Sequence, residues 1–256
     1  MKRIFLDQRE NPAPPAWQAL HLAALLLLFS LISWALLART DLKWEAVWKY
    51  RGVFFSGWLL TIGLSFAALL LSLLIGAASA LASRSSFLPL RSLAVLYVEL
   101  VRGTPLLAQI FWFTYVVFGT LPVDRLFVGV LSLACFTGAY ISEILRAGIQ
   151  SIGESQLESA RAIGFTPLQT YRFVIFPQAL RQALPPLAGQ FASLIKDSSL
   201  LSVIGISEFT LAAQQSASAT YTTLESYLPL ALGYLALTVP IFLFTRWLER
   251  RSHFLT

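Results

Sequence analysis

The sequence has little charge and almost no cysteine. Of its 256 residues, 12% are charged and 57% are hydrophobic, whereas soluble domains carry about 25% charged residues. The mean hydropathy of +0.69 and several apolar runs of about 20 residues indicate a protein that crosses a membrane. Because Cys135 is the single cysteine, the chain has no internal disulfide framework. The composition predicts an integral membrane protein with one membrane domain.

Motifs for several other functions are missing. No G-x-x-x-x-G-K-S/T phosphate loop occurs, so if ATP drives this protein, another chain must bind the nucleotide and its Mg²⁺. His21 and His253 lie far apart without ligand-spaced companions, and we expect no metal site. No nucleophile–base constellation suggests an intramembrane enzyme. The net charge of +6 comes from arginines spread along the chain, which is typical of membrane topology and not of nucleic-acid binding.

Six apolar runs predict six spans. They cover residues 17–38, 54–82, 88–118, 126–148, 178–206 and 226–247. The first run exceeds the apolar core of about 7–15 residues in a secretory signal, so we interpret it as a retained anchor. Charged and aromatic residues alternate over 39–53, which favours an interfacial helix. Residues 207–225 are predicted to be a weakly polar connection.

The second and fifth predicted spans contain residues that bear on helix packing and helix continuity. Gly57-x-x-x-Thr61 and Gly76-x-x-x-Ala80 in the second run predict close approach of neighbouring backbones. The fifth run contains Pro185-Pro186 and Lys196-Asp197-Ser198-Ser199, and both are expected to break its helix.

The distribution of lysine and arginine predicts the orientation. Alternating the spans from a cytoplasmic N-terminus places twelve of these residues inside and five outside, and leaves Arg102 and Lys196 at membrane depth. This bias favours cytoplasmic N- and C-termini. It also places the polar segment 150–177, between the fourth and fifth spans, in the cytoplasm.

The polar segment 150–177 is predicted to form a rigid elbow. The capping boxes S-x-x-E at 155–158 and T-x-x-Q at 166–169 predict two short helices. Gly164 can close the first helix, because glycine adopts the left-handed conformation without steric penalty. Pro177 is expected to interrupt the helical run beyond the second. A stiff elbow between spans offers a surface to a partner.

The third span carries the string Glu99-Leu-Val-Arg102-Gly103-Thr104-Pro105. Opposite charges at i and i+3 share one helix face, so Glu99 and Arg102 are predicted to pair. Gly103 and Pro105 are expected to kink or break the helix. Two interpretations remain: an internal ion pair that stabilises the bend, or a substrate path that Arg102 and Thr104 contact.

Two further charged clusters lie at membrane depth. Glu143 and Arg146 repeat the i, i+3 spacing and are predicted to form a structural ion pair near the inner interface. Lys196-Asp197-Ser198 adds adjacent opposite charges and a hydroxyl to the fifth run. Disturbed helices expose backbone groups that can bind a zwitterion. This cluster is therefore either a substrate path or gate, or a structural pair.

The elbow resembles the EAA loop of ABC importer permeases. That pattern has Glu-x-Ala, a glycine four residues after the alanine, and a later apolar–x–apolar–Pro. Here it is formed by Glu158, Ser159, Ala160, Gly164, Val174, Phe176 and Pro177. Ser159 stands where the general pattern has a second alanine. The resemblance implies that ATPase coupling is carried by Glu158, Ser159, Ala160, Gly164, Phe165 and Pro177.

Further strings are similar to the polar amino-acid branch of these permeases. They are E-L-V-R-G-T-P at 99–105, Y-x-x-E-x-x-R at 140–146, and K-D-S-S-L at 196–200. The resemblance implies an all-α integral membrane fold, the type I (MetI-like) core of five transmembrane helices, with one extra N-terminal helix. The expected domains are an N-terminal segment 1–52, a permease domain 53–250 and a cytoplasmic tail 251–256.

The resemblance also implies partners. A cytoplasmic ABC ATPase dimer would bind ATP and Mg²⁺, so that this chain has no cofactor and no enzymatic activity of its own. A second permease chain, identical or homologous, and an extracytoplasmic substrate-binding protein would complete an importer for a polar amino acid in the lipid of a bacterial inner membrane. The alternative, a secondary transporter or channel without an ATPase, explains the spans and buried charges but not the capped elbow.

Overall fold

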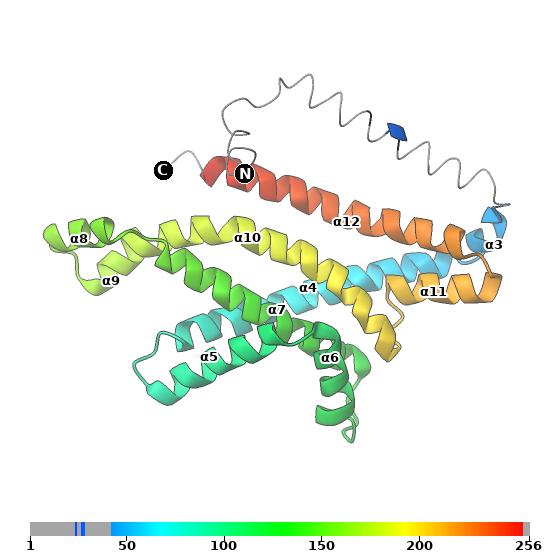
Figure 1. Ribbon diagram of the computed structural model, residues 1–256, viewed down its shortest axis with the longest axis horizontal. Helices are drawn as coiled ribbons and strands as arrows, with labels where there is room; N and C mark the ends of the chain where they lie inside the picture. The colour runs from blue at the N-terminus through cyan, green and yellow to red at the C-terminus, as the bar shows by residue number, and fades with distance from the viewer. Residues whose placement is uncertain (1–23, 25–26, 29–41, 253–256) are drawn as a thin grey trace, which may run out of the picture. The chain divides into compact units, whose positions relative to one another are not determined.

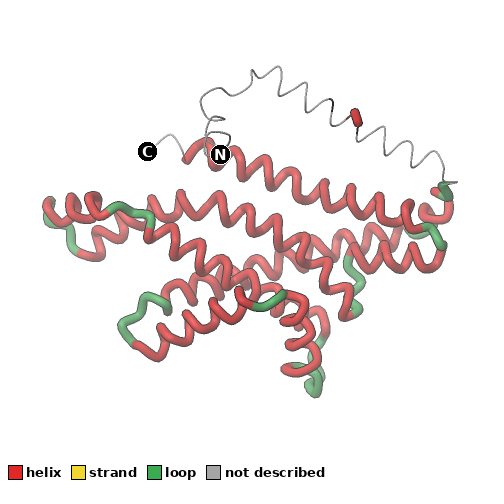
Figure 2. Tube along the Cα trace, in the orientation of Figure 1, coloured by secondary structure: helices red, strands yellow, loops and turns green. Residues whose placement is uncertain are grey.

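The computed structural model describes residues 24, 27, 28 and 42–252 (Figure 1). The chain forms two compact units, Met1–Trp44 and Glu45–Thr256, and the second contains the long helices. The predicted first span, residues 17–38, lies almost wholly outside the described residues. Every regular element in the described part of the chain is helical (Figure 2), which agrees with the predicted all-α class.

In chain order, the helical elements are α3 (Trp44–Trp48), α4 (Arg51–Ala82), α5 (Leu88–Gly103), α6 (Leu106–Phe111), the π-helix η2 (Trp112–Val117), α7 (Arg125–Gln150), α8 (Glu154–Ala162), α9 (Pro167–Thr170), the π-helix η3 (Tyr171–Ile175), α10 (Phe176–Asp197), the 3₁₀ helix η4 (Ser198–Ile204), α11 (Phe209–Thr220) and α12 (Thr223–Ser252).

Within the described residues, three helices are long and apolar enough to cross a membrane. These are α4, α7 and the part of α12 from Thr223 to Glu249, and a fourth is added if the bent pair of α5 with α6–η2 counts as one span. Helix α10 carries Arg181, Lys196 and Asp197 along its 22 residues and does not meet this criterion. The total of six spans stays a prediction.

The predicted interruption of the third run is confirmed. Helix α5 ends at Gly103, and the chain continues into α6 after a bend of 111°. Thr104 is extended, with φ −121° and ψ 147°, and Pro105 caps α6. A residue before proline is pushed out of the helical region by the proline ring, so Pro105 and its neighbour define the corner.

The fifth run is not broken at Pro185-Pro186, where a break was expected, but its α-helix does end at Asp197 within the second expected break. Pro185 and Pro186 lie inside α10, which continues through both of them. A proline removes one backbone hydrogen bond, and here both α7 and α12 pack against α10 and hold the helix together. The helix then tightens into η4 and ends at Gly205, whose φ is +80°.

The connection predicted over 207–225 contains a helix that sequence reasoning missed. Helix α11 begins after Glu208, which acts as its N-cap by accepting hydrogen bonds from the N–H groups of Thr210 and Leu211. Glutamate is not among the preferred N-cap residues, so this start carries no ordinary sequence signal.

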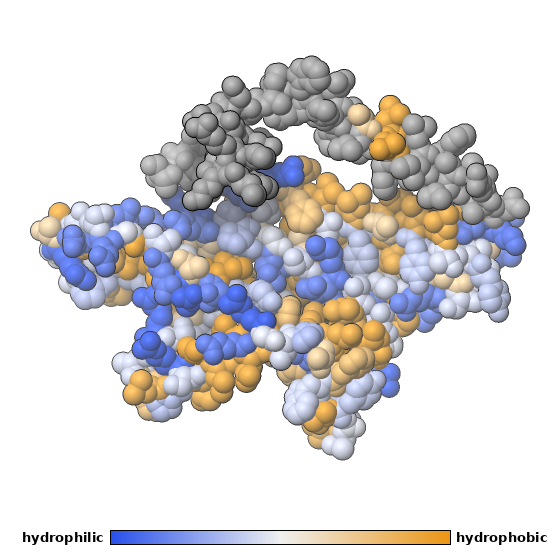
Figure 3. Space-filling view, in the orientation of Figure 1, coloured by the Kyte–Doolittle hydropathy of each residue, from blue (hydrophilic) through white to orange (hydrophobic). Residues whose placement is uncertain are grey.

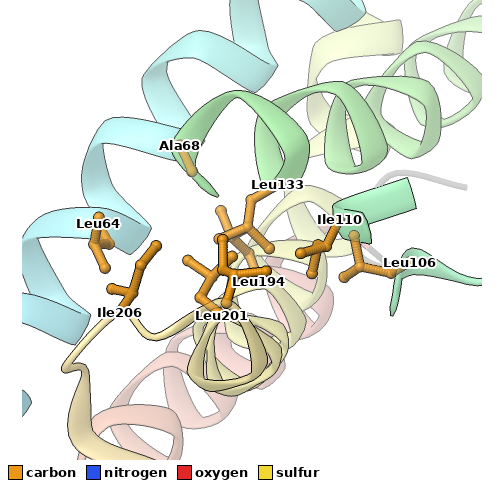
Figure 4. Close-up of a cluster of buried hydrophobic side chains, with 9 residues drawn as sticks. Leu64, Ala68, Leu106, Ile110, Leu133, Leu194, Leu201 and Ile206 are labelled. Atoms are coloured by element: carbon orange, nitrogen blue, oxygen red, sulfur yellow. The ribbon is translucent and has the colours of Figure 1, made fainter. Parts of the chain in front are cut away.

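The core is built where α4, α6, α7, α10 and η4 meet (Figure 4). Its fully buried side chains include Ile110, Leu133, Leu194 and Leu201. A second cluster joins the start of α4 to α11 through Phe54 and Phe209, whose rings meet edge to face at 6.1 Å.

Small residues allow the close contacts of α4, as predicted. A Cβ at Gly76 would lie 2.6 Å from Cγ2 of Ile141 on α7, and a Cβ at Gly57 would lie 3.0 Å from Cβ of Ala212 on α11. Such positions admit only glycine without a shift of the neighbouring helix. In Figure 1 the α8–α9 elbow projects at the end of α10, away from these contacts.

Candidate functional site

The first arm of the elbow is α8, and its start differs from the prediction. The helix begins at Glu154, with Gly153 as an extended N-cap that provides no side-chain hydrogen bond. Ser155 therefore lies inside the first turn, and the predicted capping box at 155–158 is wrong. Glu154 accounts for the earlier start, because a carboxylate in the first turn interacts favourably with the positive end of the helix dipole.

Gly164 closes α8, as predicted. Its φ is +82°, a region that favours glycine. The N–H of Gly164 donates to the carbonyl of Arg161 at 2.9 Å, and the N–H of Phe165 donates to the carbonyl of Ala160 at 3.0 Å. These two bonds form a Schellman motif, which fixes the direction in which the chain leaves the helix.

The second arm begins with the predicted capping box. The N–H of Gln169 donates to Oγ1 of Thr166 at 3.3 Å, and the N–H of Thr166 donates to Oε1 of Gln169 at 2.8 Å. The predicted interruption at Pro177 is wrong, because α9, η3 and α10 follow one another without a break. The π-helical turn Tyr171–Ile175 adjusts the backbone just before Pro177, where a regular helix would clash with the proline ring.

The elbow exposes apolar side chains. Ile163 is 70% exposed, Leu168 75% and Phe173 59%. Glu158 and Ser159 are also exposed, whereas Ala160 is buried. The ring of Phe165 packs on Phe173 with centroids 6.1 Å apart. A groove of about 360 Å³ between α8 and the start of α10 is lined by residues that include Ser159, Ile163 and Val174.

The predicted ion pair on α7 is confirmed. Nε of Arg146 donates to Oε2 of Glu143 at 2.8 Å, and Nη2 of Arg146 donates to Oε1 of the same carboxylate. Nη1 of Arg146 donates to Oε1 of Gln150 at 2.5 Å. Both oxygens of Glu143 are thus engaged by one guanidinium in the bidentate geometry that such pairs favour.

The predicted pair on α5 is wrong. Arg102 reaches across to α7, where its Nη1 lies 3.8 Å from Oε1 of Glu143 and its guanidinium lies 5.4 Å from the ring centroid of Tyr140. Helix α7 therefore offers Arg102 both a carboxylate and an aromatic face, and this outweighs the carboxylate one turn back on α5. In the part of the chain that the structure describes, no hydrogen bond or ion pair engages Glu99.

Thr104 serves the bend between α5 and α6. Its Oγ1 donates to the carbonyl of Leu100 at 2.8 Å and accepts from Nε2 of Gln109 at 2.9 Å. The same Gln109 amide donates to the carbonyl of Val101 at 2.8 Å. The side chain of Gln109 thus satisfies backbone groups that the corner leaves without helical partners.

The Lys196-Asp197-Ser198 cluster lies at the junction of α10 and η4. Nζ of Lys196 lies 5.8 Å from the ring centroid of Phe242 on α12, and Lys196 is exposed while Asp197 is half-buried. Oγ of the buried Ser198 donates to the carbonyl of Ile195 at 2.7 Å. Among the described residues, no hydrogen bond or ion pair joins this cluster to Arg102. Helix α6, which follows the corner at Thr104, packs against η4, which follows the cluster.

Glu208 is a residue that sequence reasoning missed. It is fully buried, and its carboxylate accepts hydrogen bonds from the N–H groups of Thr210 and Leu211 and from the hydroxyl of Tyr234, at 2.8 to 3.0 Å. Thr61 of α4 approaches it at 3.5 Å. Burial raises the pKa of the Glu208 carboxyl, and these donors oppose the increase. Through these hydrogen bonds the Glu208 carboxylate links α4, α11 and α12.

The long apolar helices and the projecting, glycine-closed elbow define a membrane permease. The chain belongs to the family described as "Binding-protein-dependent transport system inner membrane component", whose model matches residues 72–253. The resemblance drawn from the sequence is thereby confirmed.

Several relatives carry names from amino-acid transport. The chain is 36% identical over 204 residues to the probable glutamine ABC transporter permease protein GlnM of Bacillus subtilis, covering 78% of this chain and 93% of the relative. It is 33% identical over 215 residues to the glutamine transport system permease protein GlnP of Escherichia coli, covering 83% and 98%. The nopaline transport system permease protein NocM of Agrobacterium fabrum is 39% identical over 189 residues, covering 70% and 78%.

Solved structures show the same architecture. A chain from the crystal structure of an amino acid ABC transporter with histidines superposes with a TM-score of 0.77 at 36% identity, covering 83% of this chain and 100% of that one. A chain of the inward-facing MetNI methionine ABC transporter gives a TM-score of 0.65 at 19% identity, covering 79% and 97%. The second similarity concerns the fold alone.

Proposed function

We propose that this chain is the transmembrane permease subunit of an ATP-driven importer for a polar amino acid or a close analogue. The observation that carries the proposal is the elbow, a short helix closed by a Schellman motif at Gly164 and followed by a second arm that continues into α10 without a break. The names of the glutamine and nopaline permeases support a polar amino acid as the substrate.

The elbow is the coupling element to a cytoplasmic ABC ATPase. Ile163 and Leu168 stand out on its surface and are suited to a hydrophobic cleft of the partner, and Glu158 and Ser159 provide polar contacts beside them. Ala160, Gly164, Phe165 and Pro177 shape the elbow. A pair of ATPase subunits binds ATP and Mg²⁺, and this chain supplies the mechanical connection.

Transport follows alternating access between two permease chains. ATP binding brings the ATPase subunits together, and α9 of the elbow moves as one with α10 because no break separates them. The helices around Arg102 and Lys196 then exchange an inward opening for an outward one. Arg102 and Thr104 at the α5–α6 corner, and Lys196 and Asp197 at the α10–η4 junction, line the substrate path, and the buried Ser198 supports this junction.

The orientation and the remaining partners follow from the charge bias. The N- and C-termini and the elbow lie in the cytoplasm of a bacterial cell, and an extracytoplasmic binding protein delivers the amino acid on the opposite side. Several apolar side chains of α12, among them Leu232, Leu235 and Leu243, are more than half exposed and give this helix a surface suited to lipid (Figure 3).

Co-purification tests the coupling role of the elbow. The permease is expressed with a candidate ABC ATPase from the same organism, and Leu168→Asp is compared with the conservative control Leu168→Met. A charge at the centre of a hydrophobic contact is expected to reduce ATPase recovery by about tenfold or more, whereas methionine preserves it. Equal recovery with Leu168→Asp, at equal permease expression, would remove the elbow from the interface. A permease that transports without any ATPase would instead be a secondary transporter.

A further inference from the structure

An open, charged cavity lies between the end of α4 and helices α5 and α7. Its volume is about 370 Å³, and its lining includes Glu99 and Arg102 from α5 and Glu143 and Arg146 from α7. The surface in Figure 3 shows hydrophilic side chains gathered along α7, between α10 and α5. The volume falls in the range of about 300–1,000 Å³ that is usual for small-molecule sites.

Glu99 is the unusual member of this lining. It stands on α5 among apolar neighbours in the chain, and no hydrogen bond or ion pair reaches its carboxylate from the described residues. Glu99 is exposed on the surface of this chain, and it belongs to the third predicted span, where an ionisable group normally pairs with another group or serves a substrate path. The two arginines of the cavity are turned toward Glu143, which leaves the exposed carboxylate of Glu99 open to a ligand.

Arg102 has unused hydrogen-bonding capacity. Its separation of 3.8 Å from Glu143 is an ion pair but exceeds hydrogen-bond distance, and Glu143 is already engaged on both oxygens by Arg146. Tyr140 supports the guanidinium at 5.4 Å and fixes its position. In the described part of the chain, the five N–H donors of Arg102 therefore have no acceptor and can receive a carboxylate.

We infer that this cavity binds the α-amino-acid group of the substrate, with the Glu99 carboxylate accepting from the α-ammonium and the Arg102 guanidinium donating to the α-carboxylate. The two residues are three positions apart on α5, so their Cβ atoms lie about 5–6 Å from each other on one helix face. That separation suits the adjacent charges of one zwitterion. The inference rests on the proposed amino-acid transport and adds Glu99 as the residue that selects for the ammonium group.

Equilibrium binding to the permease–ATPase complex in lipid nanodiscs, without the binding protein, tests the site. The probes are radiolabelled L-glutamine, together with the other standard amino acids, and two competitors: glutaramate, which lacks the α-amino group, and 4-aminobutanamide, which lacks the α-carboxylate. The wild-type complex is expected to prefer its amino acid over both competitors by about tenfold or more, because charge-assisted hydrogen bonds are the strong ones.

The variants separate recognition from folding. Glu99→Gln is expected to weaken amino-acid binding by about tenfold to a hundredfold. It should abolish the preference over glutaramate but not the preference over 4-aminobutanamide. Glu99→Asp should retain both preferences. The control is Glu45→Gln, an exposed glutamate of α3, which should bind like the wild type. Should Glu99→Gln not assemble with its ATPase, Arg102→Gln is the second variant. It is expected to lose the preference over 4-aminobutanamide while keeping the preference over glutaramate, and an unchanged preference over both would show that the assigned site is wrong.

The outcomes are distinct. If the wild-type complex binds glutaramate as tightly as its amino acid, or if Glu99→Gln keeps the wild-type preference, the assigned site is wrong. If no amino acid binds although a loaded binding protein stimulates ATP hydrolysis, the site is wrong and the proposed function stands. If no amino acid stimulates hydrolysis or enters proteoliposomes, the proposed function itself fails.

Discussion

The Gly164→Val substitution places strain at a single point of the elbow. No heavy atom lies within 4 Å of a Cβ built on Gly164, so the new side chain meets no steric obstacle from its surroundings. The cost comes from the backbone alone, because Gly164 has φ +82° and β-branched residues are strongly disfavoured there. The substitution therefore weakens the turn without disturbing the core.

The magnitude follows from the conformation. A non-glycine residue in the left-handed helical region costs roughly 1–2 kcal/mol, which corresponds to a factor of about 5–30 in the population of the native turn. We expect the partner ATPase to bind the elbow in this conformation. When the ATPase concentration is limiting, the ATP hydrolysis that the loaded binding protein stimulates should therefore fall by the same factor. Asparagine tolerates the left-handed region, so Gly164→Asn should stay within about threefold of the wild type.

The assay uses the full complex in proteoliposomes, with stimulated ATP hydrolysis and amino-acid uptake measured on the same preparation. Basal hydrolysis by the ATPase alone and the melting temperature of the permease serve as references. Loss of coupling with Val and its retention with Asn, at similar melting temperatures, is the expected pattern. Full coupling with Val would show that the geometry at Gly164 does not matter for energy transfer.

Three further predictions concern other parts of the molecule. Gly76→Val should lower the melting temperature of the permease, because overpacking a tight contact costs about 1–3 kcal/mol; an unchanged temperature would show that the α4–α7 contact can relax. Glu208→Ala leaves its buried donors without an acceptor and should destabilise the fold by about 1–3 kcal/mol, while Glu208→Gln should cost less in the same thermal unfolding assay. In a Cys135→Ser background, a membrane-impermeant maleimide added to intact cells should label Lys49→Cys and not Ile163→Cys, and the reverse result would invert the proposed orientation.

Local signals in the sequence were sufficient for much of the fold and the elbow. The Gly164 turn, the capping box at 166–169 and the corner at Pro105 were predicted correctly, because each depends on the conformational preferences of a few adjacent residues. The apolar runs likewise located the long helices, since an apolar run near the thickness of the bilayer is itself the physical requirement for a span.

Other features depend on contacts between distant segments. Arg102 was assigned to Glu99 one turn away, and the structure gives it Glu143 and Tyr140 on another helix. Spacing along one helix cannot reveal which faces of two helices meet. The buried group around Glu208 was missed for the same reason, since its donors come from three helices.

The prolines show where single-residue rules fail. Pro177 and Pro185-Pro186 were expected to interrupt helices, yet α10 contains all three. A π-helical turn accommodates the first, and packing of α7 and α12 against α10 supports the other two. Helix-breaking rules describe an isolated helix in water, whereas neighbouring helices can compensate for a lost backbone hydrogen bond.

The helical run from Pro167 to Ile204 has an unusual boundary at each end. Among the described glycines, only Gly164 and Gly205 have positive φ, and they flank this run on either side. At about 1.5 Å per residue the α-helical part alone extends to a length comparable with a bilayer. A helical run bounded by two fixed turns is one stiff strut, so in the proposed mechanism a displacement at one end is carried to the other without bending along its length.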